Sequence, residues 1–491
     1  MKNLVPAIIF LLLASSCSVS KPYNPATKFS PQQLREDYRI FRQSLEEAHP
    51  SLYWFTPKDS MDLYFAQGEA KLGDSLPEYK FRYVLSYVLS KIRCGHTSVR
   101  PSKAAARYAE RVRSVSFPLG LKLWKDTAVV VANLNRRDSL VKRGSLLLSI
   151  EGRPVQQLID SMFSHLSTDG YNTTHKYQVL SNGSSFRNFY AALYGLRPRM
   201  EVSYLDTAGN LRTAALPVFN PLADTPRPRI PLPQLTKRER KKINLNTQRS
   251  MRIDTSLQTA FLEVNTFSKN YRLRGFFRRS FREIRKKGIE NLVVDMRGNG
   301  GGSVNLSNLL TKYIADKPFK IADSLYAITN KSRYKQYRGD YFLNRLFFIF
   351  MVRKKKDGLY HFAMFENKYF KPKKNNHFSG TTYILTGGNT FSAASLFTKA
   401  LKPQPDVVVV GEETGGGAYG NTAWLIPDVT LPNTKVRFRL PLFRLVVDSN
   451  ETKGRGIIPE VEAGPTVESI RRNTDYKIEK VAELIKAKNR S

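Results

Sequence analysis

The stretch that decides the fold is Asn291-Leu-Val-Val-Asp295-Met-Arg297-Gly298-Asn299-Gly300-Gly301-Gly302. It reads as a buried apolar strand that runs into a tight glycine-rich turn, with a helix expected after the turn. A second stretch repeats this order: Thr382-Tyr-Ile-Leu-Thr386-Gly387-Gly388-Asn389-Thr390-Phe391-Ser392-Ala393-Ala394-Ser395. Strands and helices that alternate in this way predict an α/β fold for the region from about 251 to 465.

The two glycine-rich turns also predict a chemistry. Ser392 lies where a strand gives way to a helix, so its hydroxyl could be exposed as a nucleophile. The N–H of Ala393 would then lie at a helix N-terminus, which favours negative charge. The first turn exposes further N–H groups that could hold an oxyanion. A serine that only caps a helix remains the alternative, and Ser395, one turn further on, is the competing serine.

The composition limits the class of protein. A chain of 491 residues is expected to form two to four domains, and 41% hydrophobic residues suffice for sizeable cores. The net charge of +38 is extreme, but it is spread along the chain and accompanies no nucleic-acid motif. We therefore expect no specific nucleic-acid partner, and a basic surface that could face anionic envelope polymers.

The N-terminus predicts export. Met1-Lys2-Asn3 is a short positive region, and the apolar stretch 4–14 is too short to span a bilayer. Cys17 follows small residues as in a bacterial lipobox, although Ala14 stands where leucine is usual. We expect Cys17 to carry a lipid that anchors the chain to the periplasmic face of the cell envelope. A plain cleaved signal peptide and an uncleaved anchor are the alternatives.

The rest of the chain divides by composition and periodicity. Ser30-Pro31 predicts a helix start, and the linker is rich in proline and basic residues. The expected segments are a signal peptide (1–17), a tether (18–29), a helical region (30–110), a β-rich domain (114–218), a basic linker (219–250), the α/β core (251–465) and a C-terminal helix (466–491).

The β-rich domain resembles a PDZ-like domain, because a strand is followed by the turn Gly152-Arg-Pro154-Val155. The resemblance implies that a loop at 117–121 caps a peptide carboxylate with backbone N–H groups. The peptide-binding residues would be Phe117, Leu119, Gly120 and Leu121. An ordinary β-rich domain is the alternative.

The apolar run 346–352 is flanked by Arg345 and by the basic stretch 353–356. Such a run usually lies in a core, but it could also enter a membrane interface. The sequence leaves both interpretations open.

A serine nucleophile needs a base, and the chain has six histidines. His96 stands out, because it follows Gly95 at the end of an apolar helix and precedes a strand start at Thr97. A purely structural histidine is the alternative. The remaining histidines are His49, His165, His175, His361 and His377.

Five motifs in fixed order carry a resemblance to a family. They are Gly95-His96-Thr97, Asp295-Met-Arg297-Gly-Asn-Gly-Gly-Gly302, Thr390-Phe-Ser392-Ala-Ala394, Gly411-Glu-Glu-Thr414-Gly415-Gly416 and Gly456-Ile-Ile-Pro459-Glu460. Together they resemble the C-terminal-processing and tricorn-core family of serine peptidases. The resemblance implies a multidomain α/β fold: a helical N-terminal region, a PDZ-like domain and a crotonase-like core of the tail-specific protease type.

The family has two catalytic branches. One uses a lysine 25 residues after the serine, a position that is Gly417 in this chain. The other uses a histidine in the Gly-His-Thr segment and a late glutamate. The resemblance therefore implies His96 as general base and Glu451, 59 residues after Ser392, as the acid that orients it. Asp448, Glu412 and Glu413 are rivals for the last role.

The implied activity is peptide-bond hydrolysis by an envelope-anchored serine peptidase. Ser392 would attack, and the N–H groups of Ala393 and of Gly300 or Gly301 would bind the oxyanion. No metal site is apparent, and this chemistry needs no cofactor. The alternatives are a non-catalytic peptide-binding lipoprotein of the same fold and a basic envelope protein that binds anionic polymers.

Overall fold

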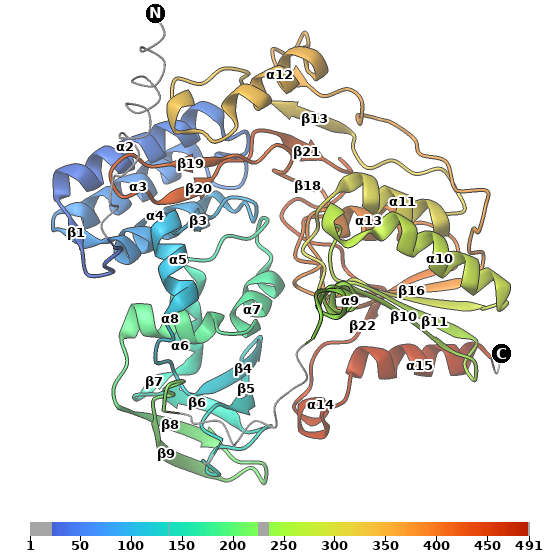
Figure 1. Cartoon of the computed structure of the whole chain (residues 1–491), viewed down its shortest axis with the longest axis horizontal. Helices are drawn as coiled ribbons and strands as arrows, with labels where there is room; N and C mark the ends of the chain where they lie inside the picture. Colours follow the sequence, from blue (N-terminus) through green and yellow to red (C-terminus); the bar gives the residue numbers. More distant parts are fainter. Residues whose placement is uncertain (1–21, 137, 224–234, 490–491) are drawn as a thin grey trace, which may run out of the picture.

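The computed structural model describes residues 22–136, 138–223 and 235–489 (Figure 1). The predicted signal peptide, with Cys17, lies outside the described residues. Cys94 is buried and forms no disulfide within the described part of the chain. None of the helices described there is long and apolar enough to cross a membrane.

The α/β core is a six-stranded sheet in the order β10-β11-β12-β16-β17-β22. The strands are β10 (Arg249–Asp254), β11 (Thr259–Val264), β12 (Asn291–Asp295), β16 (Thr381–Thr386), β17 (Val407–Gly411) and β22 (Val461–Glu462). Only β10 pairs antiparallel. The α/β prediction is therefore confirmed, and both predicted strands, β12 and β16, lie side by side at its centre.

Helices cover both faces of this sheet (Figure 1). One face carries α10 (Leu273–Lys286), α11 (Val304–Ile314) and α13 (Ala393–Leu401); the other carries α15 (Tyr476–Lys488). Apolar residues fill both layers. Because β12 and β16 are parallel neighbours, their carboxyl ends bring the two glycine-rich turns to one edge of the sheet.

The N-terminal region is helical as predicted. Its elements are β1 (Lys28–Phe29), α2 (Pro31–Ala48), α3 (Lys58–Glu69), η1 (Ala70–Leu72), β2 (Leu76–Pro77), α4 (Glu78–Ile92), β3 (Val99–Arg100) and α5 (Lys103–Arg111). Ser30 caps α2 and Gln33 completes a capping box, which confirms the predicted start. This region shares one hydrophobic core with strands from the C-terminal half.

Those later strands form two small sheets. The elements of this part are β13 (Ser324–Ala327), α12 (Tyr341–Met351), β14 (Arg353–Lys354), β15 (Tyr360–His361), β18 (Gly420–Asn421), β19 (Asp428–Thr430), β20 (Arg437–Arg439) and β21 (Arg444–Val446), with the short helices η2 (Lys269–Tyr271) and η3 (Lys335–Tyr337) elsewhere in this half of the chain. One sheet has the order β14-β15-β13-β21-β18 and the other β19-β20-β3. The second sheet ties the N-terminal region to the catalytic half.

The β-rich domain is a sheet in the order β4-β5-β6-β8-β9, with β7 paired to β6. Its elements are β4 (Leu119–Trp124), β5 (Thr127–Asn133), β6 (Leu146–Ile150), β7 (Arg153–Pro154), α6 (Val155–Phe163), α7 (Thr173–Ser181), α8 (Ser185–Tyr194), β8 (Arg199–Leu205) and β9 (Leu211–Pro217). Strands β8 and β9 pair antiparallel as a hairpin. The loop predicted at 117–121 is wrong, because Leu119, Gly120 and Leu121 lie in strand β4, and the side chains of Phe117, Leu119 and Leu121 are buried.

Two further boundaries differ from the prediction. The basic linker contains a helix, α9 (Lys237–Gln248), which Thr236 and Glu239 start with a capping box. The C-terminal segment holds two helices, α14 (Val467–Arg472) and α15, which Asn473 separates in a left-handed conformation.

Candidate active site

Ser392 occupies a sharp turn between β16 and α13. Its backbone has φ 54° and ψ −122°, a conformation that residues other than glycine rarely adopt. The Thr390 hydroxyl holds this turn, because it donates to the Met296 carbonyl and accepts from the Gly387 N–H. A strained serine between a strand and a helix is the geometry of an exposed nucleophile. Ser395, the competing serine, is buried and donates to the Thr390 carbonyl.

The first glycine-rich turn packs directly on Ser392. Gly301 has φ +100°, and a Cβ added there would lie 2.6 Å from the Ser392 Cβ and 3.0 Å from the Ala393 nitrogen. The Gly301 N–H donates to the Asn299 Oδ1 at 2.8 Å. Since that N–H is already engaged, it is not free for an oxyanion. In the described part of the chain, the N–H groups of Gly300 and Ala393 have no hydrogen-bond partner.

His96 lies in the same site. Helix α4 ends after Ile92, Arg93 adopts a left-handed conformation, and the chain turns back so that His96 packs on the Phe391 ring at 4.7 Å between centroids. The side chain is 5% exposed, and neither ring nitrogen has a hydrogen-bond partner among the described residues. Burial lowers the His96 pKa to about 3, assisted by the positive charge of Arg439. His96 is therefore neutral at pH 7 and could accept a proton.

The acid beside His96 is Asp169, which no motif in the sequence singles out. Its Oδ1 lies 3.9 Å from His96 Nδ1 and accepts from the Gly95 N–H at 2.8 Å. Its Oδ2 accepts from the Gly417 N–H at 3.3 Å. Burial raises the Asp169 pKa to about 7. Gly417, the position where the other branch of the family carries lysine, thus contacts the carboxylate that faces His96.

Glu451 lies elsewhere. It accepts from Lys399 Nζ at 2.6 Å, and Asp448 binds the same ammonium at 2.8 Å. This ion-pair cluster leaves the Lys399 side chain only 17% exposed. Among the described residues, Glu451 makes no hydrogen bond to His96.

The other rivals for the orienting acid are also engaged. Glu412 pairs with the buried Lys477 at 2.8 Å, and Glu413 pairs with Arg455 at 2.9 Å. Asp169 is therefore the acid that the fold brings to His96.

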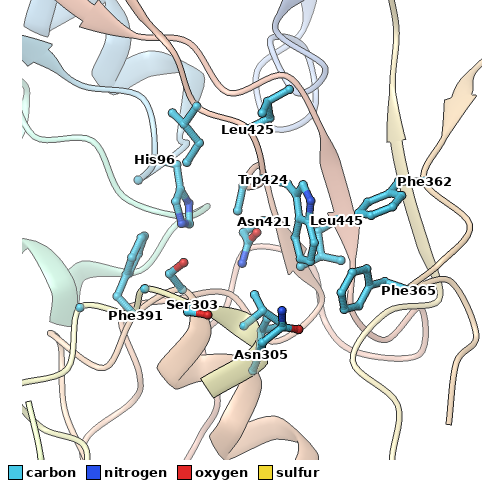
Figure 2. Close-up of a pocket in the computed structure, with 18 of the residues that line it drawn as sticks. His96, Ser303, Asn305, Phe362, Phe365, Phe391, Asn421, Trp424, Leu425 and Leu445 are labelled. Carbon is cyan, nitrogen blue, oxygen red and sulfur yellow. The ribbon is translucent and has the colours of Figure 1, made fainter. Parts of the chain in front are cut away.

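Ser392 and His96 line one cavity of about 1080 Å³. Figure 2 shows His96 and Phe391 on one side of it, with Phe362 and Phe365 on the opposite side. The far wall is mostly apolar and aromatic and comprises Phe347, Phe362, Phe365, Phe370, Trp424, Leu425 and Leu445. Such a wall fits a large apolar side chain.

His175, on α7, also lines this cavity. It also stacks on Phe391, at 4.9 Å between ring centroids, and its Nδ1 hydrogen-bonds the Gly388 carbonyl at 2.7 Å. That bond makes Nδ1 the donor and leaves Nε2 as an acceptor. His175 is therefore a second imidazole in the cavity that Ser392 lines.

Cys94, His96 and Asp169 are the described residues whose grouping could hold a metal ion. Their ligand atoms lie within 4.8 Å of one another, and all three are buried. Ligands of one tetrahedral zinc ion lie about 3.5 Å apart. The 3.9 Å between His96 Nδ1 and Asp169 Oδ1 exceeds this separation, so the side chains would have to move to bind zinc.

Known proteins share this fold. The structure of mature CPAF complexed with lactacystin aligns with a TM-score of 0.65 at 15% identity, covering 93% of this chain and 98% of that one. The structure of a CPAF S499A mutant aligns with a TM-score of 0.62 at 14% identity, covering 90% of this chain and 94% of that one. Among curated proteins, none matches this sequence.

The family assignment comes from the sequence of the α/β core. Residues 258–463 match the model of Peptidase family S41, and this range contains both glycine-rich turns and Ser392. The resemblance to C-terminal-processing and tricorn-type peptidases is thereby confirmed. Residues 258–463 therefore form a domain that matches Peptidase family S41, and the chain is a serine-type peptidase.

Proposed function

We propose that this chain hydrolyses peptide bonds with Ser392 as nucleophile, His96 as general base and Asp169 as the residue that positions His96. One observation carries the proposal: the strained Ser392 and a buried, neutral histidine without a hydrogen-bond partner line the same cavity. Asp169 replaces Glu451 in this proposal, because Glu451 is paired with Lys399.

The chemistry follows from these groups. Ser392 Oγ attacks the scissile carbonyl carbon while His96 takes the hydroxyl proton. The carbonyl oxygen becomes an oxyanion, which the N–H groups of Ala393 and Gly300 stabilise. His96 then gives the proton to the leaving amine, and the C–N bond breaks to leave an acyl-serine. Water, deprotonated by His96, attacks the ester and restores Ser392.

The resting geometry is that of an open site. His96 Nε2 and Ser392 Oγ make no hydrogen bond to each other. Catalytic hydrogen bonds often tighten only when substrate binds. His96 packs on Phe391, the residue before Ser392, and both side chains line the same cavity, which supports their joint role when substrate is bound.

The substrates are peptides or proteins, and we propose that a large apolar side chain of the substrate occupies the aromatic wall of the cavity. Trp424 and Phe365 pack edge to face at 4.7 Å and provide a rigid surface for it. A panel of fluorogenic peptides that differ at one position should show preference for phenylalanine or leucine over aspartate. Equal turnover of all peptides would contradict this preference.

We propose further that the chain is exported and lipid-anchored through Cys17 in the cell envelope. The support is the N-terminal sequence alone. Cells fed a labelled fatty acid should incorporate it into the wild-type chain and not into the Cys17→Ser variant. Equal incorporation in both would contradict the anchor.

Active-site labelling tests the catalytic proposal. A fluorophosphonate should modify Ser392 alone, which mass spectrometry of the digested protein can locate. Ser392→Ala should abolish labelling, and Ser395→Ala is the matched control that should retain it if it folds. A folded wild-type chain that never reacts would support the non-catalytic peptide-binding alternative instead.

A further inference from the structure

The sequence left two interpretations for the apolar run 346–352, a core segment or a membrane contact. Most of this run lies in helix α12, and the helix has two apolar faces. The inner face is core: Phe348 is buried and stacks on Phe443 at 5.2 Å, while Phe347 packs edge-on against Phe362 at 5.0 Å. The outer face is apolar too, but it is uncovered.

Four large side chains form this outer face. Their exposed fractions are Phe342 72%, Leu343 63%, Ile349 51% and Phe350 68%. Phe342 and Ile349 are seven residues apart, as are Leu343 and Phe350, so the four lie on one side of the helix over two turns. A contiguous exposed apolar face of this kind marks an interaction site.

Basic residues border the outer face. Arg353, Lys354, Lys355 and Lys356 follow the helix directly and are exposed. Lys355 pairs with Glu366, whereas Arg353, Lys354 and Lys356 have no acidic partner among the described residues. An apolar helix face with adjacent unpaired cations is complementary to an anionic lipid surface, where rings enter the acyl boundary and ammonium groups meet phosphates.

The position of α12 in the molecule agrees with this partner. The segment before α12 is fixed to α2, because Ser332 Oγ donates to Glu47 and the Tyr334 hydroxyl donates to Gln43. Helix α2 begins at Pro31, 14 residues after Cys17. An extended chain of this length reaches at most about 50 Å. A membrane that held the proposed anchor would therefore be within reach of this side of the molecule.

We propose that α12 is a monotopic membrane-docking helix, whose outer face Phe342, Leu343, Ile349 and Phe350 inserts into the interface of an anionic bilayer. Docking is independent of peptide hydrolysis, and it adds to the proposed lipid anchor a second, reversible membrane contact. Its inner neighbour Phe347 lines the catalytic cavity, so the docked helix holds that cavity close to the membrane.

Site-specific fluorescence tests this proposal. An environment-sensitive fluorophore is attached to Phe350→Cys in the full chain carrying Cys17→Ser; Cys94 is buried and stays unlabelled. Vesicles of phosphatidylcholine and phosphatidylglycerol should shift its emission to the blue, and pure phosphatidylcholine should do so far less. The matched control is Leu211→Cys, 67% exposed on the β8–β9 hairpin, which should not respond.

A second variant tests whether the outer face of α12 makes the membrane contact. The double substitution Phe342→Ser and Ile349→Ser, with the label retained at Phe350→Cys, should weaken vesicle partitioning by about tenfold or more. Fluorophosphonate labelling of Ser392 in the same variant reports separately on catalysis. Identical emission with and without anionic vesicles overturns the proposal. So does a concentration-dependent dimer in sedimentation that this double substitution abolishes, because the occupant would then be a second copy of the chain.

Discussion

At the scale of single residues, the proposed site combines Ser392 with a histidine and an acid that lie far from it in the sequence. Ser392 and the glycines of both turns could be predicted, because each turn is a pattern of a few consecutive residues. Asp169 is 73 residues from His96 in the sequence and follows no recognisable pattern. Only the fold, through Gly95 and Gly417, brings its carboxylate to the histidine.

Asp169→Asn tests the positioning role. Because burial raises the Asp169 pKa to about 7, kcat/KM of the wild type should rise as the pH increases through 7 and the carboxylate ionises. The variant should lose about 10³- to 10⁴-fold in kcat, as for the corresponding change in a serine triad, and this rise should disappear. A variant with the wild-type pH profile would remove Asp169 from the mechanism.

The same raised pKa makes a prediction about stability. The folded state holds the Asp169 proton up to about pH 7, whereas an unfolded aspartate loses it near pH 4. Folding stability of the wild type should therefore fall between about pH 4 and 7, and the Asn variant should lack this contribution. Urea unfolding of both proteins across this range gives the comparison.

Gly301→Ala tests the contact between the two turns. A methyl group would meet the Ser392 Cβ at 2.6 Å and would have to adopt φ +100°. We expect a loss of about 1–3 kcal/mol in the free energy of unfolding. At Gly300 an added Cβ meets nothing within 4 Å, so Gly300→Ala is the matched control for stability. Equal unfolding curves for the two variants would contradict this geometry.

At the scale of elements, the sequence allowed correct predictions where it carries cap residues or a regular alternation of apolar and polar residues. The capped start of α2 and the hairpin β8–β9 follow from cap residues and alternation. The loop placed at 117–121 was wrong although the signal was present: Phe117, Leu119, Leu121 and Leu123 alternate at period two, which is the pattern of a half-buried strand. Helix α9 was also missed although its signal was present, since Thr236 and Glu239 have the spacing of a capping box.

Helix α15 docks on the sheet through a buried charge that no sequence pattern revealed. Lys477 is 2% exposed, and its ammonium donates to the Thr386 carbonyl and to Glu412 Oε2. Glu412→Ala would leave this charge without its counterion, so we expect a loss of about 3–5 kcal/mol in the free energy of unfolding.

The matched control for this pair is Glu468→Ala, which removes an exposed partner of Arg472 and should cost less than about 1 kcal/mol. Adding Lys477→Met to Glu412→Ala should recover part of the loss. Chemical denaturation of the three variants measures their free energies of unfolding for this comparison. Equal effects of the two single substitutions would mean that the buried pair does not fix α15.

At the scale of the whole molecule, the fold class could be predicted from the sequence, but the pairing of distant segments of the chain could not. Strands and helices alternate from 251 onward, which predicts α/β, and the S41 domain confirms it. The pairing of β13 with β21, more than 100 residues apart, has no local signature. The same holds for β3, which joins β20 and thereby brings the His96 segment over the catalytic core.

The proposed catalytic residues come from distant parts of the chain. His96 belongs to the N-terminal region, Asp169 and His175 to the β-rich domain and Ser392 to the core, and both histidine rings contact the Phe391 ring. We propose His96 as the base, because it is the histidine that faces Asp169. His175 instead has its Nδ1 bound to the Gly388 carbonyl.

The measurement that tests this claim most directly is steady-state turnover of an unfolded protein substrate by His96→Ala and His175→Ala, with folding of each variant checked by circular dichroism. His96→Ala should lose at least about 10³-fold in kcat. His175→Ala should lose far less, because it removes a stacking partner of Phe391 and a hydrogen bond to the Gly388 carbonyl but not the proposed base. A folded His96→Ala variant with near-normal turnover, or a loss confined to His175→Ala, would contradict the account.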